Sequence, residues 1–282
     1  MTQTADSTDV TLTNYDPPAL TTLRLDIHPG RVAVLTVNRP ERMNSQTVTM
    51  FEEFGTAAYA LRDTDARALI IRGAGDRAFC SGFDLDEISV ITRMGIREFL
   101  QFQELAAGGM AALRHLPFPV IAAIYGAASG GGMSLALAAD IRLLAPKAKF
   151  NAAFVKVGLS VGELSNSWQL SRLIGPGRAA EIAYTGRLVG AEEAVRIGLA
   201  NRIVAHDRLM DEAFALAGAI SANSPGGVRL SKRALQRNQE IGSYAAALEL
   251  ENRGQALLTR CADMPEALAA FREKRPPRFT GE

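Results

Sequence analysis

Apolar and polar positions repeat along the chain with two periods, one typical of strands and one typical of helices. Residues 21–27 and 31–38 alternate around His28, Pro29 and Gly30, which predicts two strands joined by a turn. Further strands are predicted over 68–72, 120–125 and 140–144, and helices from about 45 to 61 and over 97–115, 179–184 and 191–197. Because strands and helices alternate in this way, the pattern predicts the α/β class.

The pattern of apolar positions changes after Val204. From there to the end the spacing of apolar residues is helical throughout, with helices expected over 208–221, 226–239, 243–260 and 264–272. We therefore expect a core over residues 21–204 and a helical segment over residues 205–282. Residues 1–20 are rich in Thr and Asp and have neither the basic start nor the apolar centre of a secretory signal, so we expect a mobile tail there.

A glycine-rich turn is the first candidate for chemistry. The apolar strand that ends at Tyr125 runs into Gly126–Gly132, and a helical pattern follows up to Ala139. The first amides of a helix have no partners within it and attract negative charge. The phosphate motifs GxGxxG and GxxxxGK[ST] are both absent here, so a developing oxyanion is the better candidate. An oxyanion site needs a second amide, and the small-residue turn AFCSGFD at 78–84 is the candidate for it.

Five stretches together resemble the crotonase superfamily, which includes the enoyl-CoA hydratases and isomerases. They are DRAFCSGFDLDEI, PVIAAIYGAASGGGMSLALAADIRL, NRPERMN at 38–44, TGRLVGAEEAVRIGLANRIV at 185–204 and AFREKRPP at 270–277. The resemblance covers nearly the whole chain after about residue 20. It implies a crotonase-like ββα spiral core, a C-terminal helical trimerisation segment, an acyl-CoA substrate, and a homotrimer or dimer of trimers.

The resemblance also implies residues for the site. It places the two oxyanion amides at Ser81 and Gly131, and the coenzyme A along the turn from Ser81 to Leu85, that is Ser81, Gly82, Phe83, Asp84 and Leu85. The resemblance also implies Arg42, Phe271 and Lys274 as contacts to coenzyme A, and the two cationic side chains among them suit phosphates. Phe154 and Trp168 are expected in the core or the acyl pocket. No cofactor is expected besides the coenzyme A of the substrate.

The expected acid and base residues differ from those of the hydratases. Members that hydrate a double bond carry two glutamates, and the matching positions here are Ser134 and Phe154. Adding water calls for one group that activates the water and another that protonates carbon, so two carboxylates suit that reaction. The remaining carboxylate is Glu163 in the segment VGLSVGELSNSW. One carboxylate suffices for a 1,3 proton shift, and the apolar residues around Glu163 are expected to raise its pKa.

These residues favour double-bond isomerisation with Glu163 as the base. Three alternatives stay open: a hydratase acting with one carboxylate, a catalytically silent acyl-CoA binder, and, less favoured, a hydrolase built on Ser129 or Ser134, for which GxSxG is not satisfied. Glu163 could also be an acid favoured by a helix N-terminus. Asp84 is expected to cap a helix, and Asp140 to be a structural hydrogen-bonding residue.

Composition excludes several classes of partner. The chain of 282 residues carries 31 basic and 30 acidic residues, a balance that favours neither nucleic acid nor an anionic membrane. Its apolar runs are interrupted before the roughly 20 residues that a membrane span needs. The two cysteines, Cys80 and Cys261, are too few to staple the fold, which favours a cytoplasmic protein, and the three histidines show no metal spacing, so no metal site is expected.

Overall fold

The structure is a computed structural model that describes residues 12–282. For residues 1–11, the expected mobile tail lies outside the described part of the chain. Residues 12–20, in contrast, lie against the core: Leu12 is 2% exposed, and the Thr13 amide and hydroxyl donate to the Asp65 carboxylate at 2.9 and 3.0 Å. Tyr15 and Leu20 also pack against the core, so this stretch is held in place, contrary to the expectation of a mobile tail.

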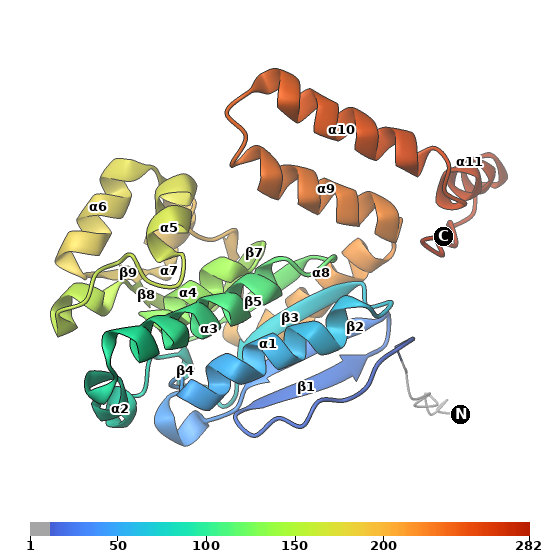
Figure 1. Ribbon diagram of the computed structural model, residues 1–282. Coiled ribbons are helices and arrows are strands. Elements are labelled where there is room, and N and C mark those ends of the chain that lie inside the picture. The colour runs from blue at the N-terminus through green and yellow to red at the C-terminus, as the bar shows by residue number, and fades with distance from the viewer. Residues whose placement is uncertain (1–11) are drawn as a thin grey trace, which may run out of the picture.

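A six-stranded sheet forms the centre of the molecule (Figure 1). Its strands are β1 (Leu23–His28), β2 (Val32–Val37), β3 (Ala68–Gly73), β5 (Val120–Ile124), β7 (Ile141–Leu144) and β10 (Arg202–Ile203), in the order β1-β2-β3-β5-β7-β10. β1 and β2 pair antiparallel, which confirms the predicted hairpin, and the other neighbours pair in parallel.

A second sheet of very short strands lies beside the first. It consists of β4 (Ala78–Cys80), β6 (Ala127–Ser129), β8 (Lys149–Asn151) and β9 (Leu188–Gly190), in the order β4-β6-β8-β9. β4 follows β3, β6 follows β5 and β8 follows β7, so the chain visits the two sheets in turn and then enters a helix each time. This repetition is the predicted ββα spiral. The short strands themselves were not predicted, because three residues are too few to show a period of two.

Most helices of the spiral match the predicted pattern, whereas the helix at Asn166–Ile174 was not predicted. They are α1 (Val48–Arg62), α2 (Ile88–Arg93), α3 (Ile96–Arg114), α4 (Gly131–Ala138), α5 (Asn166–Ile174), α6 (Pro176–Thr185) and α7 (Ala191–Arg196), with 3₁₀ turns at Pro40–Arg42, Leu85–Glu87, Ala153–Val157 and His206–Arg208. α1 begins later than the expected position near Ser45, because the Thr47 side chain accepts the Met50 amide and so caps the helix.

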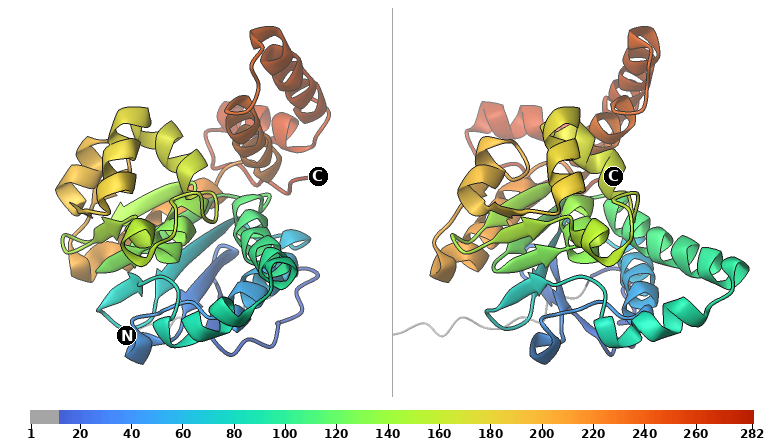
Figure 2. Two further views of the ribbon diagram at one scale, coloured as in Figure 1. Left: turned by 60° about the vertical axis from the view of Figure 1, so that its left-hand side comes forward. Right: turned by 90° about the vertical axis from the view of Figure 1, so that its left-hand side faces the viewer.

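The C-terminal segment is helical, as predicted, with α8 (Leu209–Ser221), α9 (Pro225–Asn238), α10 (Tyr244–Leu258) and α11 (Asp263–Glu273). α8 buries Leu209, Ala213 and Ala217 against the sheet, so by its packing it belongs to the core although it lies beyond the boundary expected near 205. α9, α10 and α11 stand away from the core (Figure 2). No helix within residues 12–282 is long and apolar enough to cross a bilayer.

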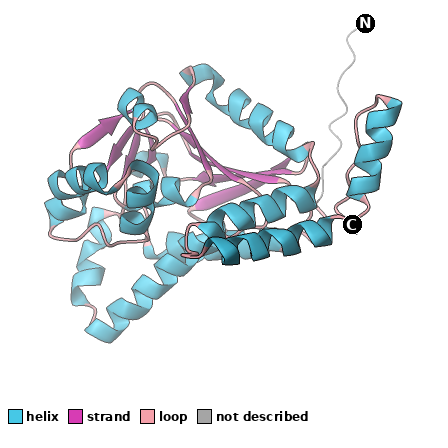
Figure 3. Ribbon diagram, turned by 90° about the horizontal axis from the view of Figure 1, so that it is seen from above, coloured by secondary structure: helices cyan, strands magenta, loops and turns pink. Residues whose placement is uncertain are grey.

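The large sheet separates two layers of the core, and Figure 3 shows its strands running between helices. Neighbouring strand residues point to opposite layers: Leu35 packs in the layer with α1 and α3, and Val34 packs in the layer with α8. Burial on both faces explains why β2, β3 and β5 read as nearly continuous apolar runs.

Candidate active site

The two turns singled out in the sequence meet in space. β4 and β6 pair in parallel, so the segments that follow them leave the small sheet side by side. Gly82 has φ of +98°, and a Cβ atom added there would lie 2.7 Å from the Ser129 carbonyl oxygen and 3.6 Å from the Gly131 amide nitrogen. The turn after β4 therefore touches the start of α4 with no room for a side chain between them.

Hydrogen bonds to the segment 43–46 decide which amide of the first turn is free. The Ser81 amide donates to the Met43 carbonyl at 3.1 Å, and the Asp84 amide donates to the Gln46 carbonyl at 2.8 Å. The amides of Gly82 and Phe83, in contrast, have no acceptor within residues 12–282.

The Ser81 amide, predicted as an oxyanion donor, is therefore already engaged, and Phe83 offers a free amide in the same turn. Gln46 bonds to the Gly82 carbonyl at 2.7 Å and to the Asp84 amide, which makes a parallel bridge between Gln46 and Phe83. In such a bridge the N–H group of Phe83 points away from Gln46. The positive φ of Gly82 turns the chain between Ser81 and Phe83, so their two amides face different surroundings.

Gly131, the other predicted oxyanion donor, supplies a free amide from the second turn. It is the first residue of α4, where amides have no partner within the helix, and no acceptor for its N–H lies within the described chain. Its carbonyl accepts the Gln46 side-chain amide at 3.1 Å. A Cβ atom on Gly132 would overlap the Cys80 carbonyl oxygen, so this turn also needs glycine for close approach. The amides of Phe83 and Gly131 are thus donors without an acceptor in the described chain, one from each of the two turns that meet.

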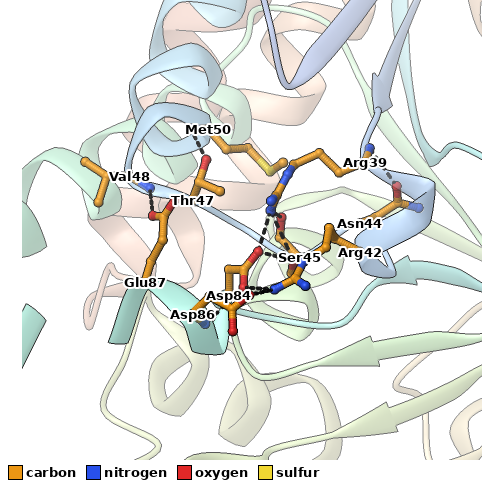
Figure 4. A network of polar contacts seen from close by, with 10 residues as sticks. All are labelled: Arg39, Arg42, Asn44, Ser45, Thr47, Val48, Met50, Asp84, Asp86 and Glu87. Atoms are coloured by element: carbon orange, nitrogen blue, oxygen red, sulfur yellow. Dashed lines mark hydrogen bonds and ion pairs between the residues drawn. The ribbon is translucent and has the colours of Figure 1, made fainter. Parts of the chain in front are cut away.

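Asp84 fastens the first turn to the segment 38–46 (Figure 4). Its carboxylate accepts the Arg39 Nη1 at 2.9 Å, the Arg42 Nη2 at 2.8 Å and the Ser45 hydroxyl at 2.9 Å, and its side chain is 4% exposed. The Arg42 guanidinium, together with these other donors, holds the pKa of Asp84 well below its usual range. Asp84 also accepts the Asp86 amide at 3.1 Å, which confirms the predicted cap.

The structure gives Arg42 and Asp84 a different role from the one implied by the resemblance. Arg42 pairs with Asp84 and Asp86, although 43% of its side chain is exposed. Asp84 is turned into this network and away from solvent. The network therefore positions the backbone of the first turn, and Arg42 can meet a phosphate only through the part of its guanidinium that the two aspartates leave exposed.

Asp84→Asn is expected to lower the free energy of unfolding by about 2 kcal/mol at pH 7, because two arginines lose their charged acceptor. The pKa of Asp84 is depressed in the folded state, so its stabilisation is present above the ordinary aspartate pKa of about 4 and is lost as the pH falls. Urea unfolding measured from pH 7 down to pH 3 should therefore show that the difference in the free energy of unfolding between Asp84→Asn and wild type becomes smaller below about pH 4. Asp86→Asn, at a site that is 76% exposed, is the control, and an equal loss there would contradict the role of Asp84.

Glu163 lies in the loop between the 3₁₀ turn at Ala153–Val157 and α5. It is half-buried, and burial raises the pKa of its carboxyl group, against a smaller opposing effect of the Gln103 side chain of α3. The residue lies outside the first turn of α5, whose cap is Ser165. It stands two residues before that cap, so a carboxylate favoured by the positive end of the helix stays an alternative.

Ser134 and Phe154 occupy the two positions at which the resemblance implies the glutamates of the hydratases, and neither side chain has a carboxyl group. The Ser134 side chain is fully buried, and its hydroxyl accepts the Asn166 Nδ2 at 2.6 Å. Phe154 is 6% exposed, and its ring lies 3.9 Å from the position of a Cβ atom on Gly130. An apolar ring thus fills the space beside the glycine turn.

Of the other residues expected to contact coenzyme A, some lie at the first turn and some lie far from it. The Phe83 ring lies 6.2 Å from that of Phe51, nearly parallel to it, and Leu85 is 69% exposed beside the same turn. Phe271, 84% exposed, and Lys274 lie on α11 and at its end, at the opposite side of the molecule from β4 (Figure 1). Within one chain, these two residues do not reach the turns.

The Cys80 thiol lies beside the first turn and is fully buried. Burial raises the pKa of the Cys80 thiol to about 12, in keeping with a small buried residue and not a nucleophile. No group of three metal-ligating side chains lies within residues 12–282. Gln46 and Asn166, both fully buried, were missed by the sequence reasoning. Nothing in their spacing marks them, since their partners lie 85 and 32 residues away.

Comparisons with known proteins agree with one another. The family model described as Enoyl-CoA hydratase/isomerase matches residues 28–282. The Mycobacterium bovis protein named "Probable enoyl-CoA hydratase echA12" is 41% identical over 267 residues, which cover 90% of this chain and 92% of that protein. The "Short-chain-enoyl-CoA hydratase" of Clostridium acetobutylicum is 36% identical, over 87% of this chain and 93% of its own. The crystal structure of an enoyl-CoA hydratase from Bacillus anthracis superposes with a TM-score of 0.88 at 32% identity, covering 93% of this chain and 100% of that one.

Proposed function

This chain belongs to the enoyl-CoA hydratase/isomerase family, and we propose that it shifts a double bond in an acyl-CoA thioester. The structures similar to it confirm the predicted crotonase-like fold. The observation that carries the proposal is the position of Glu163. Its carboxyl group is half-buried and has a raised pKa, and its loop leads into Asn166, whose side chain donates to Ser134 next to the glycine turn. Ser134 and Phe154 leave the two expected hydratase positions without an acid.

The proposed reaction starts from a 3-enoyl-CoA. The thioester carbonyl oxygen binds between the amides of Phe83 and Gly131, and the Glu163 carboxylate removes a proton from C2. The electron pair of the broken C–H bond moves to the carbonyl oxygen, and the two amides stabilise the enolate. When the enolate collapses, its electrons form the C2–C3 double bond, the former C3–C4 double bond opens, and C4 takes the proton back from Glu163. The product is a 2-enoyl-CoA of unchanged mass.

A hydratase with one carboxylate is the second candidate, and the names of the relatives favour it. Water would then have to be activated by Glu163 or by the substrate itself, without a second acid to protonate carbon. A silent acyl-CoA binder is a third possibility. A serine hydrolase built on Ser134 is disfavoured because that hydroxyl is fully buried and bonded to Asn166.

The assembly and location belong to the same proposal. α9, α10 and α11 expose Leu235, Tyr244, Leu257 and Phe271, which supports a homotrimer or a dimer of trimers. Phe271 and Lys274 would then have to meet coenzyme A bound to a neighbouring protomer, since they lie far from the turns of their own chain. Cys80 and Cys261 are both free thiols, which suits the reducing cytoplasm.

Incubation with a 3-enoyl-CoA and, separately, with a 2-enoyl-CoA tests the proposal, with the products resolved by liquid chromatography and mass detection. We expect an equal-mass product from the 3-enoyl-CoA and little or no product that is heavier by one water from the 2-enoyl-CoA. Rapid formation of the heavier product would establish a hydratase. Binding of both thioesters without any change would indicate a silent binder, and release of free coenzyme A would indicate a hydrolase.

A further inference from the structure

Asn166 joins the loop of Glu163 to the glycine turn. Its side chain is fully buried, and its Nδ2 atom donates to the Ser134 hydroxyl at 2.6 Å and to the Gly130 carbonyl oxygen at 3.5 Å. Its backbone amide donates to the Glu163 carbonyl at 2.9 Å. One residue therefore contacts both the segment with the proposed base and the turn with an oxyanion donor.

The Gly130 carbonyl is the important acceptor, because it shares a peptide unit with the Gly131 amide. A trans peptide is planar, with its C=O and N–H groups pointing in opposite directions, so holding the oxygen orients the N–H. This oxygen accepts the Ser134 amide at 3.1 Å, the Ser134 hydroxyl at 3.4 Å and Asn166. Donors at the oxygen also polarise the peptide, which strengthens its N–H as a donor.

The surroundings of Asn166 are costly for the fold. Its Oδ1 atom is buried and has no partner within residues 12–282. The two residues between Glu163 and Asn166, Leu164 and Ser165, have φ of 45° and 67°, a left-handed conformation unfavourable for side chains other than glycine. Such local costs persist where the surrounding structure fixes one conformation, and they cluster at functional sites.

We propose that Asn166, acting with Ser134, is a positioning residue that orients the Gly131 amide toward the enolate oxygen and holds the Glu163 loop beside it. The inference rests on the proposed function, because it assigns Asn166 a role in stabilising the same enolate. The amide group of Asn166 is suited to this role because its two N–H groups can donate to a hydroxyl and to a carbonyl at once. Leucine, of similar size, can donate to neither.

The test compares the binding of two thioesters by isothermal titration calorimetry. Acetoacetyl-CoA can bind as an enolate and reports on the oxyanion donors, and butyryl-CoA carries no charge at its acyl group. In Asn166→Leu, we expect the affinity for acetoacetyl-CoA to fall by roughly tenfold, less than the roughly 100- to 1,000-fold effect on rate of removing an oxyanion donor outright. The affinity for butyryl-CoA should change by less than about twofold, whereas general damage to the pocket would weaken both.

Two more variants make the result decisive. Ser134→Ala removes the hydroxyl between Asn166 and Gly130. The double variant should lose little more affinity for acetoacetyl-CoA than either single variant, because all three variants break the same hydrogen-bond network. Ser134→Ala also supplies the test if Asn166→Leu fails to fold. Ser167→Ala, at an exposed neighbour, is the matched control and should behave as wild type.

The outcomes separate this inference from the proposed function. Unchanged preference for acetoacetyl-CoA in Asn166→Leu and Ser134→Ala would overturn the role of Asn166, whatever the reaction is. Full turnover in Glu163→Gln would overturn the assignment of the base while leaving the binding comparison valid. A wild-type protein that binds acetoacetyl-CoA no better than butyryl-CoA would overturn both.

Discussion

Replacing Glu163 by glutamine is expected to lower kcat for the double-bond shift by about 100- to 10,000-fold, the range usual for losing a general base. Glutamine has the shape of glutamate and keeps a polar group at this position, but it cannot take a proton from C2. The rate of equal-mass product formation from a 3-enoyl-CoA measures the effect. KM should change by less than about twofold, because the lost interaction belongs to the transition state.

The matched control for this substitution is Glu104→Gln, an exposed glutamate on α3. It changes the net charge of the protein equally and should leave kcat within about twofold of wild type, as most exposed substitutions do. If Glu163→Gln kept the wild-type rate, another group would have to be the base. If both variants lost activity, the effect would come from charge in general and not from proton transfer.

The pH dependence of turnover follows from the same group. Burial raises the pKa of Glu163 above the ordinary glutamate value, and the base must be deprotonated to act. In wild type, kcat/KM should therefore fall with decreasing pH through an apparent pKa above about 4.5. This acid limb should be missing from the residual activity of Glu163→Gln.

Long elements of the fold could be predicted from the sequence because they carry several periods of their pattern. The four C-terminal helices begin and end within two residues of their expected positions, and the β1–β2 hairpin follows the alternation around His28. β4, β6 and β8 could not be found in this way, since each has three residues and is defined by its partners in the second sheet. The spiral was predicted from the resemblance, not from periodicity.

The choice between Ser81 and Phe83 shows why the finer geometry of the site was out of reach. Which amide is free depends on the φ of Gly82 and on a bridge to Gln46, more than 30 residues earlier in the chain. Arg42 shows the same limit. A basic residue near an expected phosphate site is readable from sequence, but its pairing with Asp84 across 42 residues is not.

Lys232 is the residue by which α9 is anchored to the core. It is the only residue of this helix that is buried, and its Nζ atom lies 2.8 Å from the Asp140 Oδ2 and 2.8 Å from the Phe118 carbonyl oxygen. Asp140 also accepts the Val120 amide at 2.8 Å and the Gln236 side chain at 3.2 Å, which confirms its predicted structural role. The anchor stands at the edge of a cavity of about 850 Å³ between the core and α9, so little other packing supports it.

Lys232→Met is expected to lower the free energy of unfolding by about 3 kcal/mol, measured by urea unfolding at a fixed protein concentration. Methionine fills the space but leaves the carboxylate of Asp140 without its cation, and breaking a buried pair on one side costs about 3–5 kcal/mol. The lower end of this range applies because 23% of the Asp140 side chain is exposed and Gln236 still donates to it.

Arg233→Met, the exposed neighbour on α9, should change the free energy of unfolding by less than about 0.5 kcal/mol. Adding Asp140→Asn to Lys232→Met should recover part of the loss, because it removes the unpaired charge. A Lys232→Met protein as stable as wild type would mean that α9 is held by contacts other than this ion pair.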